Sequence, residues 1–597
     1  MLIRTCSSRP VLILVALLFD GLWGLLGNFL LVPAVRADYI HQTLAAREGT
    51  ILELHVGEKA IEARFEIDAA DRVFFQNLLR VGSTASGADS FALLDAASGH
   101  PLPGSIVQVE TRRRTPRYDS KAPLPTNAIG EPLELPEVSP LVTFARLSYP
   151  LPKLPTEIIL RPPMGKGGEF STTAIGFIVF HENLPVINYG YFSRPEKLLL
   201  DPYDPWKSRF QNQNLKRAHS SSLTSYLTVE PFEVRHEVVV RLLDLSPLLG
   251  LKLAPDETLD EAKLAVIKQR TRDFFNSRPR TIIDGLHRKG GVIDVSLLSV
   301  DHQGIFQRKA NDAEHKPFST LLGVSLSFPN EATARSVEVS WNLFSQRIPS
   351  IAAQATDSAG PFPAVLTADS PTLRWDNVLQ RQPEAELQHV RVENRWWIGL
   401  AAYCLCILVI TVVLVVAYRS GRIQQHVKGG SKGVLICSTS LAVALFCWAM
   451  LQAAHSHHWS LTNGHAGRLI EQLLANVYRA MEFREEDQVY DRLAISLQKD
   501  TLTDVYLQQR RSMAKRDVDG ARSRVQRVNV QAVRRLGWPV WGETTRYQVI
   551  WTASGTVSHW GHTHQRQNQY EAQTGLSRSG DVWKIGNLIM LDEVRSP

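Results

Sequence analysis

The densest group of side chains that could perform chemistry lies close to the C-terminal end of the chain, between His559 and Glu571. If this stretch forms a regular strand, residues two positions apart share one face of the sheet. The residues on one face that could bind a ligand are His562, His564, Arg566, Asn568 and Tyr570. Such a face could supply a general base, a charged anchor and hydrogen-bonding groups to a small ligand.

Three interpretations of this polar face stay open. The imidazoles of His562 and His564 would lie about 7 Å apart, which allows them to bracket a divalent metal if a third ligand comes from elsewhere. Arg566 could instead anchor a small anion in a pocket wall. The face could also hydrogen-bond to helices or to a partner. The sequence offers no evident third metal ligand, because Glu571 points to the opposite face. We therefore predict no cofactor. A divalent metal bound by His562 and His564 is the alternative.

The region that must position this face, residues 461–597, changes from a helical to a strand-like pattern along the chain. Apolar residues repeat about every 3.6 positions from Leu469 to Met481 and again from Val489 to Tyr506. Turn residues then separate alternating stretches, which predict strands at 522–533, 547–553, 556–573 and 582–594. The region is therefore predicted to be an α+β domain with an antiparallel sheet.

The order of helices before strands, together with Asp581, Trp583, Lys584 and Ile585 near the end, resembles the nuclear-transport-factor-two-like family over residues 461–595. The resemblance implies a sheet curled around helices into a cone with a pocket. Members of that family include isomerases, dehydratases and non-catalytic modules, so the fold does not decide the function. The buried aspartate and histidine pairs of the catalytic members have no clear match here.

The composition of the chain is that of an ordinary globular protein. It has 597 residues, of which 44% are apolar and 21% charged, with a net charge of +7 and five cysteines, and its mean hydropathy is −0.11. These values exclude a disordered chain, a collagen and a small disulfide scaffold, and the length predicts about three to five folded units.

Two uncharged apolar runs, 396–418 and 434–453, are each long enough to cross a membrane as a helix. The loop between them, 419–433, carries lysines and arginines but no acidic residue, so the positive-inside rule places it in the cytoplasm and both large flanks outside. Residues 1–37 are predicted to be a signal peptide or an uncleaved signal anchor. These patterns predict a protein of the cell (inner) membrane whose N- and C-terminal domains lie on the extracytoplasmic side.

This location predicts membrane lipid and other envelope proteins as partners, and it excludes nucleic acid. All five cysteines fall in the signal region or in the two apolar runs. The outer domains therefore carry no thiolate nucleophile and no cysteine-bound zinc. The oligomeric state is left open.

The N-terminal outer region is predicted to form two β-rich, sandwich-like lobes, residues 38–228 and 229–394. Apolar and polar residues alternate over short stretches, as expected of strands with one buried face. One helix, 259–276, is expected in the second lobe, opened by a capping box from Thr258 to Glu261.

A long exposed loop is predicted for residues 111–140, which contain six prolines. The loop begins with a triple arginine, Arg112 to Arg114. These side chains could contact anionic lipid or form a solvated charge cluster.

The sequence as a whole predicts a multidomain membrane protein with β-rich, sandwich-like N-terminal lobes, a transmembrane helical hairpin and a C-terminal α+β domain. No convergent catalytic set is evident, which favours a non-enzymatic binding or assembly module. The alternative is a small-ligand or metal-binding pocket enzyme in the C-terminal cone, using His562, His564 and Arg566. Whether the chain is an enzyme stays open, with the non-enzymatic interpretation preferred.

Overall fold

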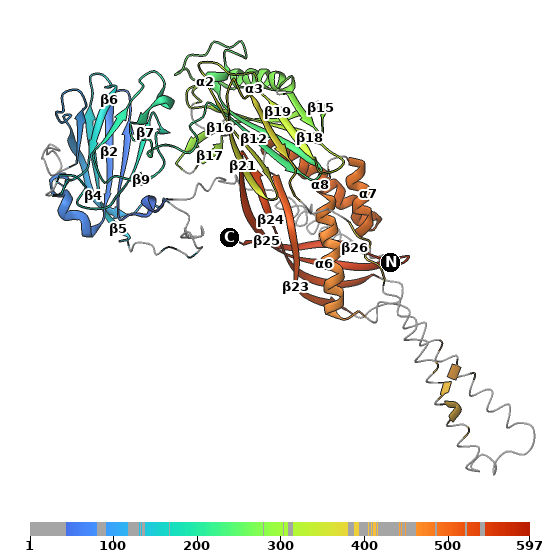
Figure 1. Cartoon of the computed structure of the whole chain (residues 1–597). Coiled ribbons are helices and arrows are strands. Elements are labelled where there is room, and N and C mark those ends of the chain that lie inside the picture. The colour runs from blue at the N-terminus through green and yellow to red at the C-terminus, as the bar shows by residue number, and fades with distance from the viewer. Residues whose placement is uncertain are drawn as a thin grey trace, which may run out of the picture.

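The computed structural model describes most of the chain outside the apolar runs. The described residues are 43–79, 91–117, 131, 133, 138–165, 168–278, 280–302, 304–308, 315–379, 387–392, 461–483, 486–519, 522–537 and 544–596, with isolated residues between 404 and 448. They form several β-sheets and a half-barrel, arranged as two β-lobes and a C-terminal domain (Figure 1).

Lobe 1 is built from two sheets that enclose an apolar core containing Leu52, Phe65, Ile158 and Phe177. The large sheet has the order β4-β5-β2-β1-β7-β8 with β9 beside β7, and the small sheet has the order β11-β10-β6-β3. The strands are β1 Thr50–Val56, β2 Ala60–Ile67, β3 Ala92–Asp95, β4 Ser105–Arg113, β5 Leu141–Pro150, β6 Glu157–Arg161, β7 Ile175–His181, β8 Leu184–Pro185, β9 Gly190–Tyr191, β10 Glu196–Leu199 and β11 Arg209–Phe210. Short 3-10 helices are η2 Leu44–Arg47, η3 Ala69–Leu78 and η4 Pro205–Lys207.

Lobe 2 has a large sheet of order β17-β16-β18-β13-β12-β20-β21 and a small sheet of order β15-β14-β19-β22. Its core includes Leu227, Val238, Val324 and Trp341. The strands are β12 Leu223–Glu230, β13 Glu233–Arg241, β14 Arg280–Ile283, β15 Leu286–Arg288, β16 Gly291–Asp301, β17 Gly304–Gln307, β18 Leu321–Pro329, β19 Ser336–Ser340, β20 Ile351–Asp357, β21 Gly360–Leu366 and β22 Thr372–Asp376. The helices are α2 Leu242–Leu245 and α3 Glu261–Asn276.

The two lobes share one strand connectivity. In each large sheet, the first strand pairs antiparallel with the second and parallel with a much later strand, as β1 does with β2 and β7, and β12 with β13 and β20. Beyond β2 lie β5 and β4, just as β18 and β16 lie beyond β13. The small sheets also match, because β3-β6-β10 and β14-β19-β22 pair in the same order. Lobe 2 is thus a topological copy of lobe 1.

Helix α3 begins later than its sequence suggests. The expected capping box at Thr258 is wrong, because the N-cap is Asp260, whose carboxylate accepts a hydrogen bond from the Lys263 backbone N–H at 2.8 Å. Leu259 pairs with His315 in an isolated β-bridge, so the chain is still extended just before the cap. Leu264, Ile267, Thr271 and Phe275 form the buried face of the helix.

The C-terminal domain packs helices against one long antiparallel sheet of order β23-β24-β25-β26, which curls into a half-barrel (Figure 1). Its core includes Leu473, Leu493, Trp551 and Ile585. The elements are α6 Asn463–Ala480, α7 Glu486–Ser496, α8 Lys499–Asp519, β23 Arg522–Leu536, β24 Thr545–His559, β25 His562–Ser579 and β26 Val582–Ser596.

The turn expected around Ser554 and Gly555 is wrong, because β24 runs through both residues to His559. Gly555 instead allows the backbone of Arg524 in β23 to approach closely, with Val525 Cα only 2.8 Å from where its β-carbon would lie. The resemblance to the nuclear-transport-factor-two-like family stays a prediction.

The transmembrane hairpin of the predicted fold class is not supported. No helix among the described residues is both long enough and apolar enough to span a membrane. The predicted spans, 396–418 and 434–453, contain only isolated described residues, and the loop 419–433 and residues 1–37 lie outside the described part of the chain.

Candidate functional site

The polar face predicted from the sequence lies on β25, and three of its members are connected by hydrogen bonds. The Asn568 amide donates to the Tyr570 hydroxyl at 3.0 Å and to Glu593 of β26 at 2.9 Å. Arg566 donates to the Asn568 amide oxygen at 3.2 Å. The ring of Tyr570 stacks on Trp551 at 5.4 Å. These side chains satisfy one another, as the side chains of a structural network do.

Burial raises the pKa of Tyr570 above its ordinary value, and the nearby carboxylate of Glu593 raises it further. The phenol therefore stays protonated and acts as a hydrogen-bonding group. The side chains of His562 and His564 lie outside the described part of the structure, so the predicted metal pair stays a prediction. Among the described residues, no group of three or more histidine, cysteine, aspartate or glutamate side chains could hold a metal ion.

The turn between β24 and β25 inserts a tryptophan into lobe 2. Trp560 and Gly561 have φ angles of 47° and 78°, and His559 pairs directly with His562 across them. This is the geometry of a two-residue hairpin turn in which both central residues are left-handed, a conformation that costs a non-glycine residue about 1–2 kcal/mol. The burial of Trp560 offsets that cost, because the residue is only 2% exposed and its side chain packs in the apolar cluster on lobe 2.

Polar contacts fix the same turn to β13 and β20. Glu237 accepts a hydrogen bond from the Gly561 N–H at 3.4 Å, and Gln354 donates to the Gly561 carbonyl at 3.3 Å. Arg235 donates to the Ser558 carbonyl at 3.1 Å. A side chain at Gly561 would collide with Tyr226, whose Cγ lies 2.7 Å from the added β-carbon. The turn can therefore pack against lobe 2 only with glycine at position 561.

Burial raises the pKa of Glu237, while the guanidinium of Arg235, 3.4 Å away, opposes that rise. Both side chains are almost inaccessible, with 1% and 5% of their surface exposed. The strand pattern of β13 predicted one buried and one exposed face. All nine residues of β13 are buried instead, because the C-terminal domain and lobe 1 cover its outer face.

Lobe 1 contributes its own tryptophan to the same place. Trp206 of η4 and Leu184 of β8 belong to a single buried apolar cluster with Trp560 and residues of lobe 2. Arg241 at the end of β13 lies 2.7 Å from Asp204 of lobe 1 and 5.0 Å from the ring of Trp206. The lobe 2 members of the cluster are Tyr226, Val239, Leu243, Leu298, Val300, Ile305, Phe318 and Leu321. We call this cluster the junction, because all three folded units meet in it.

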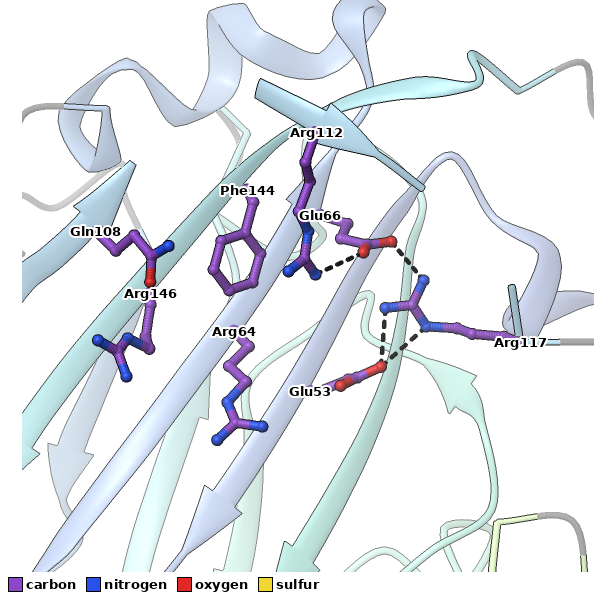
Figure 2. A pocket seen from close by; sticks show the side chains of 8 residues that line it. All are labelled: Glu53, Arg64, Glu66, Gln108, Arg112, Arg117, Phe144 and Arg146. Carbon is purple, nitrogen blue, oxygen red and sulfur yellow. Dashed lines mark hydrogen bonds and ion pairs between the residues drawn. The ribbon is translucent and has the colours of Figure 1, made fainter. Parts of the chain in front are cut away.

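A separate polar pocket of about 280 Å³ opens on the outer face of the large sheet of lobe 1 (Figure 2). Strands β1, β2, β4 and β5 form it, and Arg117, just after β4, lies at its side. The lining residues are Glu53, Arg64, Glu66, Gln108, Arg112, Arg117, Phe144 and Arg146. Four arginines against two glutamates give the lining a net positive charge.

The two glutamates hold two of these arginines in place. Glu66, 1% exposed, is 2.8 Å from Arg112 and 2.5 Å from Arg117. Arg117 also lies 2.8 Å from Glu53. The guanidinium of Arg112 covers the ring of Phe144 at 3.7 Å, in the geometry of a cation–π contact. Figure 2 shows these ion pairs along one side of the pocket.

The ionisation of both glutamates follows from these contacts. Burial alone would raise the pKa of Glu53, but hydrogen bonds from His55 and Arg117 and the charge of Arg117 outweigh burial and lower the pKa to about 2. Burial is likewise outweighed at Glu66, where hydrogen bonds from Arg117, Thr115 and Arg112 hold the pKa below its ordinary value. Both carboxylates are therefore charged at neutral pH.

The triple arginine predicted to lie in a loop falls mostly on strand β4, which ends at Arg113. Arg112 lines the pocket, and Arg114 lies 2.9 Å from Asp68 and donates to the Gly49 carbonyl at 2.7 Å. Arg112 and Arg114 are thus engaged in ion pairs, and Arg113 between them is exposed, so contact of the triple arginine with anionic lipid stays a prediction. The pocket itself was missed, and its only sequence signal was the alternation of Glu62, Arg64 and Glu66 with apolar residues in β2.

Comparison of the sequence with known protein-family models and with curated proteins gives no match. The geometry alone therefore carries the functional assignment.

Proposed function

We propose that the chain is a non-enzymatic binding or assembly module that holds three folded units together as one body. The observation that supports this function is the junction, in which Trp206 of lobe 1 and Trp560 of the C-terminal domain enter a single apolar cluster of lobe 2. Units joined only by linkers would move independently. Units that share a buried core instead present their outer surfaces at fixed separations, which is what an assembly module requires.

A second area of contact supports the same arrangement. Phe232 of lobe 2 stacks on Phe483 of the C-terminal domain at 3.9 Å. Arg522 of β23 lies 3.1 Å from Glu233 and 3.9 Å from Glu230. These contacts lie at the β12–β13 turn, and the hairpin at Gly561 contacts Glu237 further along β13. The C-terminal domain therefore contacts this strand pair at both places.

Two serine–histidine pairs resemble the start of a catalytic arrangement, but their burial argues against that role. His181 lies 2.8 Å from Ser208, and His236 lies 2.8 Å from Ser225. Each of these four side chains is at most 2% exposed, so a substrate cannot reach the hydroxyl groups. Burial lowers the pKa of His181 to about 4 and that of His236 to about 3, which keeps both imidazoles neutral. Both pairs act as buried structural hydrogen bonds.

The alternative, a pocket enzyme of the C-terminal domain using His562, His564 and Arg566, has less support. The residues beside them, Asn568 and Tyr570, are engaged in hydrogen bonds with each other and with Glu593. The location at the cell membrane, with membrane lipid and other envelope proteins as partners, stays a prediction from the sequence.

The test compares the full chain with Trp560→Ala in cells that naturally express it. We expect the wild-type chain to migrate on native gels in a complex with other polypeptides. Trp560→Ala should remove or shrink that complex while the amount of chain persists, because the C-terminal domain no longer keeps its position. Thr563→Ala, at an exposed position of the same hairpin, is the control and should leave the complex intact. A wild-type chain that migrates alone, or a complex unaffected by Trp560→Ala, would contradict the proposal.

A further inference from the structure

Two arginines face each other across neighbouring strands in the lobe 1 pocket. Arg64 of β2 and Arg146 of β5 are direct partners in the strand register, and both line the pocket. Gln108 is the partner of Arg146 on the other side, and Glu53 is the partner of Arg64. Like charges directly opposite each other in a sheet destabilise it. A sheet that retains such a pair gains stability when an anion lies between the two charges.

Arg146 is the arginine of the pocket with the fewest partners. Its Nε atom is buried, and among the described residues it has no hydrogen-bond partner. Arg64 is paired with Glu62 at 2.9 Å, and Arg112 and Arg117 are both paired with the buried Glu66. A buried donor without a partner costs about 1–3 kcal/mol, so the guanidinium of Arg146 is a site where a ligand oxygen would be favoured.

The outer face of the large sheet is covered by other side chains in lobe 2, so the same face of lobe 1 is a place where this fold can bind a partner. In lobe 2, the outer face of the corresponding strands β12, β13, β16 and β18 is covered by Trp560, Trp206 and Leu184. In lobe 1, the outer face of β1, β2, β4 and β5 carries the polar pocket instead (Figure 2). The face that is filled by apolar side chains in one lobe is polar, positively charged and hollow in the other.

We propose that the lobe 1 pocket is a binding site for a small anion that carries a carboxylate or phosphate group, a role beyond the assembly function proposed above. Arg146 supplies the fork of donors that carboxylate and phosphate oxygens prefer. Gln108 and Arg64 supply further donors on either side, and Phe144 provides an apolar surface beside them. Glu53 and Glu66 position Arg117 and Arg112 and are not ligands themselves, since like charge repels an anion.

The test is isothermal titration of the purified full chain with inorganic phosphate and, separately, with citrate. We expect at least one of them to bind, with an affinity that falls as salt is added. Preference for one probe identifies whether phosphate or carboxylate is the natural group. Arg146→Gln should weaken binding about tenfold or more, and Arg146→Lys should restore only part of it, because an ammonium group lacks the planar fork.

The matched control is Arg113→Gln, on the same sheet but outside the pocket lining, which should keep wild-type affinity. Arg146→Gln should also keep or raise the unfolding midpoint of the free protein, because it removes the opposed charges. Loss of binding together with an unchanged or higher midpoint distinguishes a ligand-binding role from a structural one. The proposal is wrong if neither probe binds at about 10 mM, a concentration well above that needed to detect millimolar affinity, or if Arg146→Gln binds as well as the wild type. None of these outcomes depends on whether the chain assembles with other polypeptides.

Discussion

The backbone of Gly323 in β18 lies directly against the indole of Trp560: a β-carbon added to Gly323 would be 2.7 Å from Cζ3 of that ring and 2.6 Å from Cδ1 of Leu298. The glycine therefore makes the space into which the hairpin of the C-terminal domain fits. No other residue type leaves that space, since every other side chain begins with a β-carbon.

Gly323→Ala should loosen the C-terminal domain from lobe 2. Adding a methyl group to a filled site typically costs about 1–3 kcal/mol of stability. Part of that cost is avoided if the Trp560 side chain moves out of the apolar cluster. We expect faster amide exchange at Gly561 and in β13, measured by hydrogen exchange and mass spectrometry. Gly291→Ala is the control, because nothing lies within 4 Å of its added β-carbon. Equal exchange in both variants would show that the indole does not depend on Gly323.

Glu66→Gln should lower the free energy of unfolding of lobe 1 more than Glu62→Gln on the same strand does. The substitution leaves Arg117, 7% exposed, and Arg112 without the carboxylate that both contact. Because Glu53 still pairs with Arg117 and Arg112 is partly exposed, the expected loss is about 1–3 kcal/mol, the cost of leaving buried hydrogen-bonding groups imperfectly paired. Chemical denaturation followed by a lobe 1 fluorescence probe measures the loss.

Glu62→Gln is the matched comparison on the same strand. Its ion pair with Arg64 has exposed fractions of 32% and 40%, and an exposed pair contributes at most about 1 kcal/mol. If the two variants lose the same stability, the buried network around Glu66 does not hold the pocket as described.

Asp260→Ala should cost lobe 2 about 1 kcal/mol, the usual value for removing an N-cap side chain. Thr258→Ala should cost less, because Asp260 and not Thr258 accepts the hydrogen bond from Lys263. Thermal unfolding of the two variants decides between the observed cap and the one expected from sequence. A larger loss for Thr258→Ala would favour the capping box.

The buried His236 should make the protein lose stability in mild acid. Its pKa is about 3 in the folded chain against an ordinary value of 6.5, because burial disfavours the charged ring. Between those pH values the unfolded chain binds a proton that the folded chain does not. The contribution of neutral His236 to the free energy of unfolding is therefore fully present above about pH 6.5. It falls as the pH drops, by up to about 1.4 kcal/mol per pH unit.

His236→Gln removes this contribution, so its free energy of unfolding should change less between pH 7 and pH 5 than that of the wild type. Replacement of His287, which is exposed, controls for the loss of a histidine as such. Parallel pH profiles for the wild type and His236→Gln would rule out His236 as the source of acid sensitivity.

Local pattern predicts single elements of this chain well but not how they meet. Alternation of Val234 and Val238 with Arg235 and Glu237 correctly indicates a strand, and it also suggests that the charged residues face solvent. They are buried because the turn at Gly561, more than three hundred residues later, covers them. Nothing in a local pattern encodes which distant segment will pack on a face.

The pocket of lobe 1 shows the same limit. Arg64 and Glu66 can be assigned to an outer strand face from sequence, but Phe144 and Arg112 come from strands whose neighbours depend on the sheet order. Proline-rich sequence after Arg112 further suggested a loop where β4 is still paired with β5. The site is made by the pairing of strands, and strand pairing between distant segments has no short-range signature.

The parallel pairing of β1 with β7 and of β12 with β20 also determines the order of events during synthesis. Neither large sheet can form completely until its late strand has left the ribosome. Lobe 1 therefore needs β7, which ends at residue 181, and lobe 2 needs β20, which ends at residue 357. Lobe 2 then still lacks Trp560, so the part of its outer face that this side chain covers stays exposed while about two hundred further residues are made. The nascent chain thus exposes part of an apolar surface until the last hairpin emerges.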